Sequence, residues 1–82
     1  MEETGTGEID RRIARRLRAL RGERGWSLDE LAGRSGVSRA SLSRLENGEV
    51  SPTAQVLGRL CAAHGLTLSR LMVEAEGAFA PL

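Results

Sequence analysis

Apolar residues recur along the chain at the spacing of α-helices, and no stretch alternates between apolar and polar residues as a strand would. The first stripe of this kind is formed by Ile9, Ile13, Leu17 and Leu20, and it predicts a helix over residues 9–24. Shorter runs with the same spacing predict four further helices, over residues 28–35, 39–46, 52–64 and from 68 onward. The pattern therefore predicts a compact all-α domain of five helices spanning residues 9–72.

Helix-capping residues mark where most of these helices begin and end. Ser27 precedes the second helix and Glu30 follows three residues later, which is the capping-box pattern. Ser51 is predicted to cap the fourth helix, with Pro52 at the first helical position, where proline is favoured. The remaining signals are two further caps and the residues that tolerate a left-handed conformation after a helix, namely Ser38, Thr67, Gly25, Gly36, Asn47, Gly48 and Gly65.

Residues 27–48 combine two short helices, a glycine turn between them and a second helix with two distinct faces. Leu42 and Leu45 point to one side of helix 39–46, and the opposite side carries Arg39, Ala40, Ser43 and Arg44. Arginine makes paired hydrogen bonds to O6 and N7 of guanine, serine reaches base edges or phosphates, and alanine contacts the thymine methyl group. We therefore expect the helix that starts at Ser38 to enter the major groove of DNA and to contact bases through these four residues.

The net charge of +1 conceals a segregation of charge along the chain. Residues 1–10 carry four acidic and no basic residues, residues 11–44 carry ten arginines against three acidic residues, and residues 45–82 carry two arginines against four. The positive charge thus lies on the first helix and the 27–48 segment, as expected of a nucleic-acid-binding protein. The first-helix arginines are interpreted as a solvated face that attracts DNA at long range, with few direct contacts, namely Arg11, Arg12, Arg15, Arg16 and Arg18.

Composition argues against a membrane protein, a metalloprotein or an enzyme. No apolar run approaches the ~20 residues of a membrane helix, and no signal peptide is visible. Cys61 cannot form an internal disulfide and is expected in the core, which favours a cytoplasmic protein. His64 is expected to interact with the dipole at the end of the fourth helix, and not to bind a metal with Cys61. Without a nucleophile beside a base, or a phosphate loop, we expect neither catalysis nor a cofactor.

The pattern resembles the helix-turn-helix of phage repressors and of bacterial xenobiotic-response-element (XRE) regulators. The motif residues that carry the resemblance are Leu31, Ala32, Gly36, Val37, Ser38, Leu42, Leu45, Glu46, Asn47 and Gly48. The resemblance extends to Ser51-Pro52-Thr53 and to Gly65-Leu66-Thr67-Leu68, so it covers roughly residues 9–72. It implies a lambda-repressor-like domain that binds double-stranded DNA sequence-specifically as a transcriptional regulator, usually as a homodimer on an inverted-repeat operator. We expect this regulator to be a repressor.

The resemblance also implies roles outside the base-reading face. In this family an arginine late in the first helix pairs with the glutamate after the recognition helix, and the matching residues here are Arg21 and Glu46. We expect this pair to be a structural clamp that orients the recognition helix. The residues expected to contact DNA phosphates are Ser27, Ser43, Asn47 and Gly48, the last through its backbone amide.

Leu28 departs from the family pattern. Many members have glutamine or threonine at this position, where the side chain helps to hold a phosphate. The leucine side chain cannot donate a hydrogen bond. The contact therefore comes from the backbone N–H or from Ser27, or it is absent.

The two ends of the chain lack a clear helical pattern. Residues 1–8 are interpreted as a flexible acidic tail and residues 73–82 as a tail or the start of a linker. The stretch from Ser51 to Met72 resembles XRE regulators that continue into a small-molecule-binding cupin domain. An effector domain beyond Leu82 is therefore one expectation.

Two other functions remain open on the sequence. An antitoxin-like autoregulator would share the fold and bind a protein partner, and a partner-binding tail in residues 1–8 or 74–82 would favour it. A protein-interaction module without DNA binding would leave the basic segment and the outward-facing Arg39 and Arg44 unexplained. DNA binding that depends on salt concentration would separate this last function from the other two.

Overall fold

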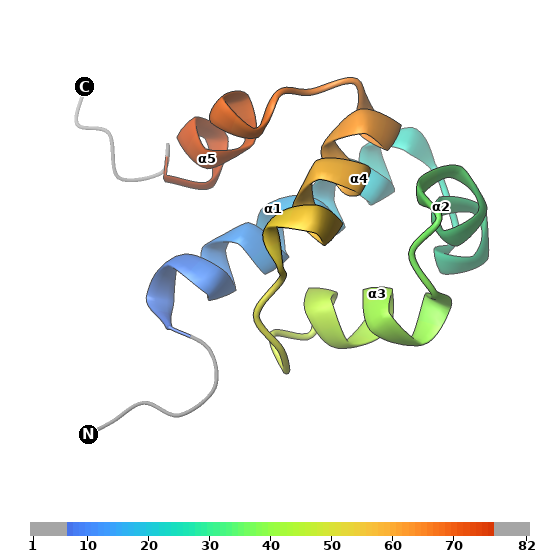
Figure 1. Ribbon diagram of the computed structural model, residues 1–82, viewed down its shortest axis with the longest axis horizontal. Coiled ribbons are helices and arrows are strands. Elements are labelled where there is room, and N and C mark those ends of the chain that lie inside the picture. Colours follow the sequence, from blue (N-terminus) through green and yellow to red (C-terminus); the bar gives the residue numbers. More distant parts are fainter. Residues whose placement is uncertain (1–6, 77–82) are drawn as a thin grey trace.

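Residues 7–76 are described by the computed structural model, and they form five helices (Figure 1). The helices are α1 (Glu8–Arg24), α2 (Leu28–Ser35), α3 (Arg39–Glu46), α4 (Ala54–His64) and α5 (Leu68–Glu76). No strand occurs within these residues, so the predicted all-α fold of five helices is confirmed. Most of the acidic tail predicted for residues 1–8 lies outside the described residues, as do residues 77–82.

The five helices enclose one hydrophobic core. Leu31 of α2, Leu42 of α3, Leu60 of α4 and Leu71 of α5 each expose no more than 1% of their surface. Burying a leucine side chain contributes roughly 1.5–3 kcal/mol, so these residues anchor their four helices to the core. Helix α1 packs against α3 and α5, and α2 packs against α3 and α4. Figure 1 shows α3 at one edge of the molecule, on the side away from α5.

The buried stripe of α1 begins one turn later than the pattern predicted. Ile13, Leu17 and Leu20 are buried as expected, but Ile9 in the first turn of the helix remains 36% exposed. Gly25 ends α1 with a φ of 70°, in the left-handed region that glycine adopts without steric cost. The helix therefore starts and stops almost where the sequence indicated, and only its first apolar residue is outside the core.

Three of the predicted helix caps are present. The Ser27 hydroxyl oxygen accepts a hydrogen bond from the Glu30 amide (3.0 Å), and Ser38 and Thr67 cap α3 and α5 in the same way. The carboxylate of Glu30 accepts from Arg34 (2.9 Å), one turn further along the helix. The two helices of the 27–48 segment consequently have the predicted bounds, residues 28–35 and 39–46.

The predicted start of the fourth helix is wrong. Helix α4 begins at Ala54, and its cap is Thr53, whose hydroxyl oxygen accepts from the Val56 amide (3.1 Å). The Ser51 hydroxyl instead donates to the carboxylate of Asp10 on α1 (2.6 Å). Because Ser51 is engaged by α1, the capping role passes to the next hydroxyl residue, and Pro52 lies before the helix.

The folded part of the chain extends beyond Met72. Helix α5 continues to Glu76, and Ala75 is 6% exposed and belongs to the core. Glu74 accepts hydrogen bonds from Arg70 (2.8 Å) and from Arg16 of α1 (2.9 Å), which lower the pKa of its carboxyl group. Alanine is a weak sequence signal for burial, which explains why the pattern did not reveal this last turn. None of the helices within residues 7–76 is both long and apolar enough to cross a membrane.

Candidate nucleic-acid interface

Helix α3 has the two faces that the sequence predicted. Leu42 and Leu45 expose 1% and 4% of their surface, which fixes one side of the helix in the core. The other side reaches solvent: Ser43 is half-buried, and Arg39, Ala40 and Arg44 are exposed. The four predicted base-contacting residues therefore lie on the side of α3 that a ligand can approach.

The turn between α2 and α3 sets the angle at which α3 is presented. Gly36 has a φ of 78°, and its amide donates to the Ala32 carbonyl (2.9 Å). Arg59 of α4 donates to the Gly36 carbonyl (3.3 Å), so a third helix contacts the turn. A residue with a Cβ would be strained at this φ, which gives Gly36 a conformational role.

Arg39 contacts the first turn of α2. Its Nε atom lies 3.4 Å from the Asp29 carboxylate, and the two side chains are 64% and 78% exposed. Exposed ion pairs contribute roughly 0–1 kcal/mol, so this pair does not prevent Arg39 from turning toward another acceptor. Asp29 also lies near the start of α2, where a carboxylate interacts favourably with the helix dipole.

A surface depression of about 460 Å³ lies where α2 and α3 begin. Leu28, the first residue of α2, forms one part of its lining. The rest of the lining comes from α3, namely Arg39, Ala40 and Ser43. Three of the four predicted base-contacting residues thus share one surface feature with the residue that departs from the family pattern.

The predicted ion pair between Arg21 and Glu46 is present and has fork geometry. Nε and Nη2 of Arg21 donate to the two carboxylate oxygens of Glu46, each over 2.8 Å. The third nitrogen, Nη1, donates to the backbone carbonyl of Trp26 (2.9 Å). The side chains are 19% and 6% exposed, and the hydrogen bond to Glu46 raises the pKa of Arg21. The pair joins α1, the start of the α2 segment and the last residue of α3.

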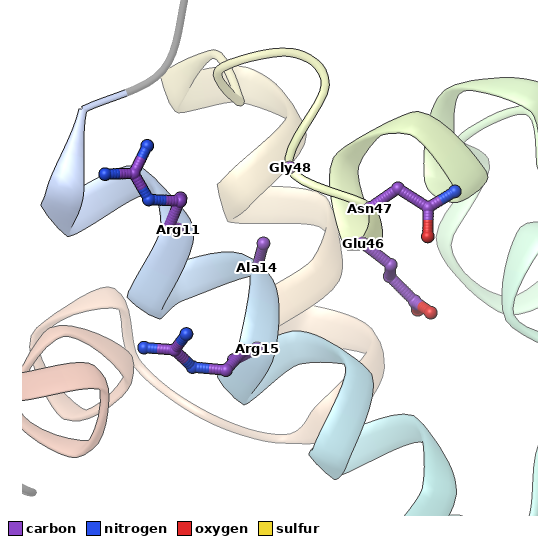
Figure 2. A pocket seen from close by; sticks show the side chains of 6 residues that line it. All are labelled: Arg11, Ala14, Arg15, Glu46, Asn47 and Gly48. Atoms are coloured by element: carbon purple, nitrogen blue, oxygen red, sulfur yellow. The ribbon is translucent and has the colours of Figure 1, made fainter.

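A second hollow, of about 230 Å³, lies beside the end of α3 (Figure 2). Arg11 and Arg15, one turn apart on α1, line it together with Asn47 and Gly48, which follow α3. Gly48 has a φ of 75°, and its amide donates to the Leu45 carbonyl (3.1 Å). The sequence interpretation treated these two arginines as a general solvated face. Two features of the sequence could have placed them here. Their i, i+4 spacing puts both arginines on one face of α1, and the predicted pair of Arg21 with Glu46 joins α1 to the end of α3.

The role predicted for His64 is wrong. The side chain is only 3% exposed and stacks on Trp26, with ring centroids 5.1 Å apart. Burial, and secondarily the positive charge of Arg24, lowers the pKa of His64, so the ring is neutral at pH 7 and gains little from the helix dipole. Arg24 itself donates to the His64 backbone carbonyl (2.9 Å) at the end of α4. Cys61 is 4% exposed, as predicted, and burial raises the pKa of its thiol.

A family model described as a helix-turn-helix domain matches residues 12–72, which includes the capped helices α2 and α3. The chain belongs to the helix-turn-helix family. The resemblance noted from the sequence is therefore confirmed, and the match covers most of the folded part of this helix-turn-helix domain.

Individual relatives are regulators. The helix-turn-helix domain is 37% identical over 65 residues to the HTH-type transcriptional regulator DdrOP3 of Deinococcus deserti, covering 79% of this chain and 50% of the relative. It is 34% identical over 64 residues to the competence pilus inhibition repressor of Acinetobacter baylyi, covering 78% of this chain and 58% of the relative. The chain thus spans about half the length of these relatives.

A solved structure shows the same fold. The crystal structure of the clp gene regulator ClgR from C. glutamicum superimposes with a TM-score of 0.78 at 31% sequence identity. The similarity covers 94% of this chain and 100% of that one. The five-helix arrangement of the helix-turn-helix domain is therefore shared over nearly all of its length.

Proposed function

We propose that this domain binds double-stranded DNA with α3 in the major groove, as the DNA-binding part of a transcriptional regulator. The observation that carries the proposal is the two-faced α3. Leu42 and Leu45 hold one face in the core, and Arg21 pairs with Glu46 at its end, so the opposite face is rigidly presented. A rigid, basic helix face is what base-edge recognition requires.

The contacts divide into two classes. Base edges are read by the exposed face of α3, through Arg39, Ala40, Ser43 and Arg44. Phosphates are held around that face by Ser27, Ser43, Asn47 and Gly48, with Arg11 and Arg15 beside the last two. The Gly48 amide already donates to a carbonyl within the chain, so the Asn47 side chain and Arg15 are the better donors there. Phosphate contacts set the register on DNA, and base contacts set the sequence preference.

The regulator acts, in this proposal, as a repressor that binds an inverted repeat as a homodimer. The similarity to the competence pilus inhibition repressor supports the direction of regulation. An α3 of eight residues reaches only a few base pairs, and a second copy related by two-fold symmetry doubles the site. Because the matched segments cover only 50% and 58% of these relatives, we include an effector domain outside this chain in the proposed function. Location in the cytoplasm follows from this function.

Salt dependence of binding tests the proposal. Affinity for random-sequence duplex DNA should fall as salt rises, with a slope of about −0.9 in log K against log salt for each phosphate neutralised. Arg15→Ala should make this slope less steep by about 0.9, the contribution of one phosphate. Arg70→Ala removes the same charge from α5, on the other side of the molecule from α3, and should leave the slope unchanged.

The comparison of the two variants excludes a general charge effect. A parent affinity that stays flat as salt rises contradicts DNA binding and favours a protein-interaction module. Equal effects of Arg15→Ala and Arg70→Ala would mean that the surface beside Asn47 has no special role. An antitoxin-like protein would bind DNA with the same salt dependence and would differ by also binding a protein partner.

A further inference from the structure

The depression between α2 and α3 has an apolar part whose composition does not suit a phosphate. Leu28 of α2 and Ala40 of α3 line it, and neither side chain can donate or accept a hydrogen bond. Leu28 is half-buried and packs against the core on its inner side, so its position is fixed. Placing a charged phosphate oxygen against this surface would remove water from the charge without replacing the lost hydrogen bonds.

The major groove offers one apolar group of suitable size. Thymine carries a C5-methyl group there, whereas unmodified cytosine has a hydrogen atom at the same position. The 5-methyl group of a methylated cytosine is chemically equivalent. A methyl group against leucine and alanine side chains gains from the removal of apolar surface from water. The apolar part of the depression therefore matches a C5-methyl pyrimidine better than any other group on duplex DNA.

We propose that Leu28 and Ala40 bind the C5-methyl group of a pyrimidine, so that α2 as well as α3 contributes to sequence preference. Arg39 lines the same depression, which places the methyl-bearing base next to the base that Arg39 reads. The proposal rests on the proposed function. It assigns Leu28 a role that replaces the phosphate contact made by glutamine or threonine in related proteins.

Replacing single thymines by deoxyuridine tests the methyl contact directly. The duplex is the preferred sequence obtained by selection from a random pool, and each replacement removes one methyl group while keeping the hydrogen-bonding edge. At one position per half-site, the parent should bind the uracil duplex about fourfold more weakly, the equivalent of about 0.8 kcal/mol for one buried CH₂-sized group. A C·G pair at that position lacks the methyl group. Replacing its cytosine by 5-methylcytosine should raise the affinity by about the same factor.

The variants assign the contact to Leu28. Leu28→Ala and Leu28→Gln should lose most of the preference for thymine over uracil at that position, because only Ala40 still contacts the methyl group. The readout is a ratio of two affinities for one protein, so a smaller folded fraction in either variant does not change it. Leu68→Ala removes a 43% exposed apolar side chain from α5 and should keep the parent ratio.

The outcomes separate this proposal from the proposed function. A parent that prefers one sequence but never distinguishes thymine from uracil overturns the methyl-binding pocket alone. A parent ratio that persists in both Leu28 variants places the methyl contact elsewhere and overturns the role of Leu28. Failure to bind any duplex overturns the proposed function, and the pocket with it.

Discussion

A neutral imidazole in the core makes the stability of this fold depend on pH. Burial lowers the pKa of His64, Arg24 and Arg16 act in the same direction, and Glu46 and Glu23 oppose them. The unfolded chain therefore takes up a proton at a higher pH than the folded chain does. This contribution to stability is full above the ordinary histidine pKa of about 6.5 and is lost as pH falls through the lowered, folded-state pKa.

Thermal unfolding at several pH values checks this expectation. The single tryptophan, Trp26, stacks on His64 and reports unfolding through its fluorescence. The Tm of the parent should fall as pH is lowered from about 7 to about 5.5, a range in which few carboxylates titrate. His64→Phe keeps an aromatic ring on Trp26 without a titrating group, and its Tm should fall less over the same pH range. Equal losses in the two proteins would show that His64 is not responsible.

The sequence could not predict the environment of residues whose contacts come from distant segments. Nothing in the pattern distinguishes a buried histidine from a surface one, because burial is decided by which helices meet around it. Ser51 was a reasonable cap, but a hydrogen bond to Asp10, 41 positions away, engages its hydroxyl. The predicted caps at Ser27 and Ser38 were correct because capping is local and needs no tertiary contact.

At the scale of the elements, α3 depends on contacts with other helices. It has eight residues, too short to be stable as an isolated helix, and tertiary packing must hold it. The forked pair of Arg21 with Glu46 closes its C-terminal end against α1. Removing one partner leaves the other charged and largely shielded from water, which costs more than the intact pair contributes.

Single substitutions of the pair test this clamp. Arg21→Ala or Glu46→Ala should lower the free energy of unfolding by about 2–4 kcal/mol and weaken DNA binding beyond the loss of folded protein. Arg70→Ala removes a 67% exposed arginine and leaves Glu74 paired with Arg16, so it should change stability by less than about 1 kcal/mol. If the variants of Arg21 and Glu46 unfold at the same temperature as the parent, the pair does not support α3.

The bounds of most helices could be predicted from the sequence. Helices α2 and α3 are framed by capping serines and by Gly36, whose φ of 78° few other residues adopt, so local chemistry defines them. The last turn of α5 was missed because Ala75 carries little hydrophobic signal, although it is 6% exposed. The packing of α5 against α1 and α4, not the local sequence, buries that turn.

At the scale of the whole molecule, folding assembles two surface features from distant segments. The hollow beside Asn47 combines α1 with the end of α3, and the depression at Leu28 combines the starts of α2 and α3. The sequence predicted the outward face of α3, because a single helix defines it. It did not predict which residues from other helices lie beside that face, because this depends on how the helices pack.

The same scale explains why a net charge of +1 is compatible with DNA binding. Several acidic residues pair with arginines within the fold, among them Glu74 with Arg16 and Glu46 with Arg21. On the exposed side of α3, Arg39 makes a weak contact with Asp29, and the side chains of Arg39 and Arg44 both reach solvent. Because residues 11–44 carry ten arginines against three acidic residues, the field near α3 is more positive than the net charge suggests.

Sequence selection from a random duplex pool, with the parent and with single variants of α3, tests the central claim most directly. Arg39→Ala should relax the preference at one position per half-site, at a cost of roughly 1–3 kcal/mol for the preferred sequence. Ser43→Ala should weaken all sequences about equally, as loss of a phosphate contact does. If Arg39→Ala and Arg44→Ala both select the same bases as the parent, these arginines do not read sequence and α3 does not dock as proposed.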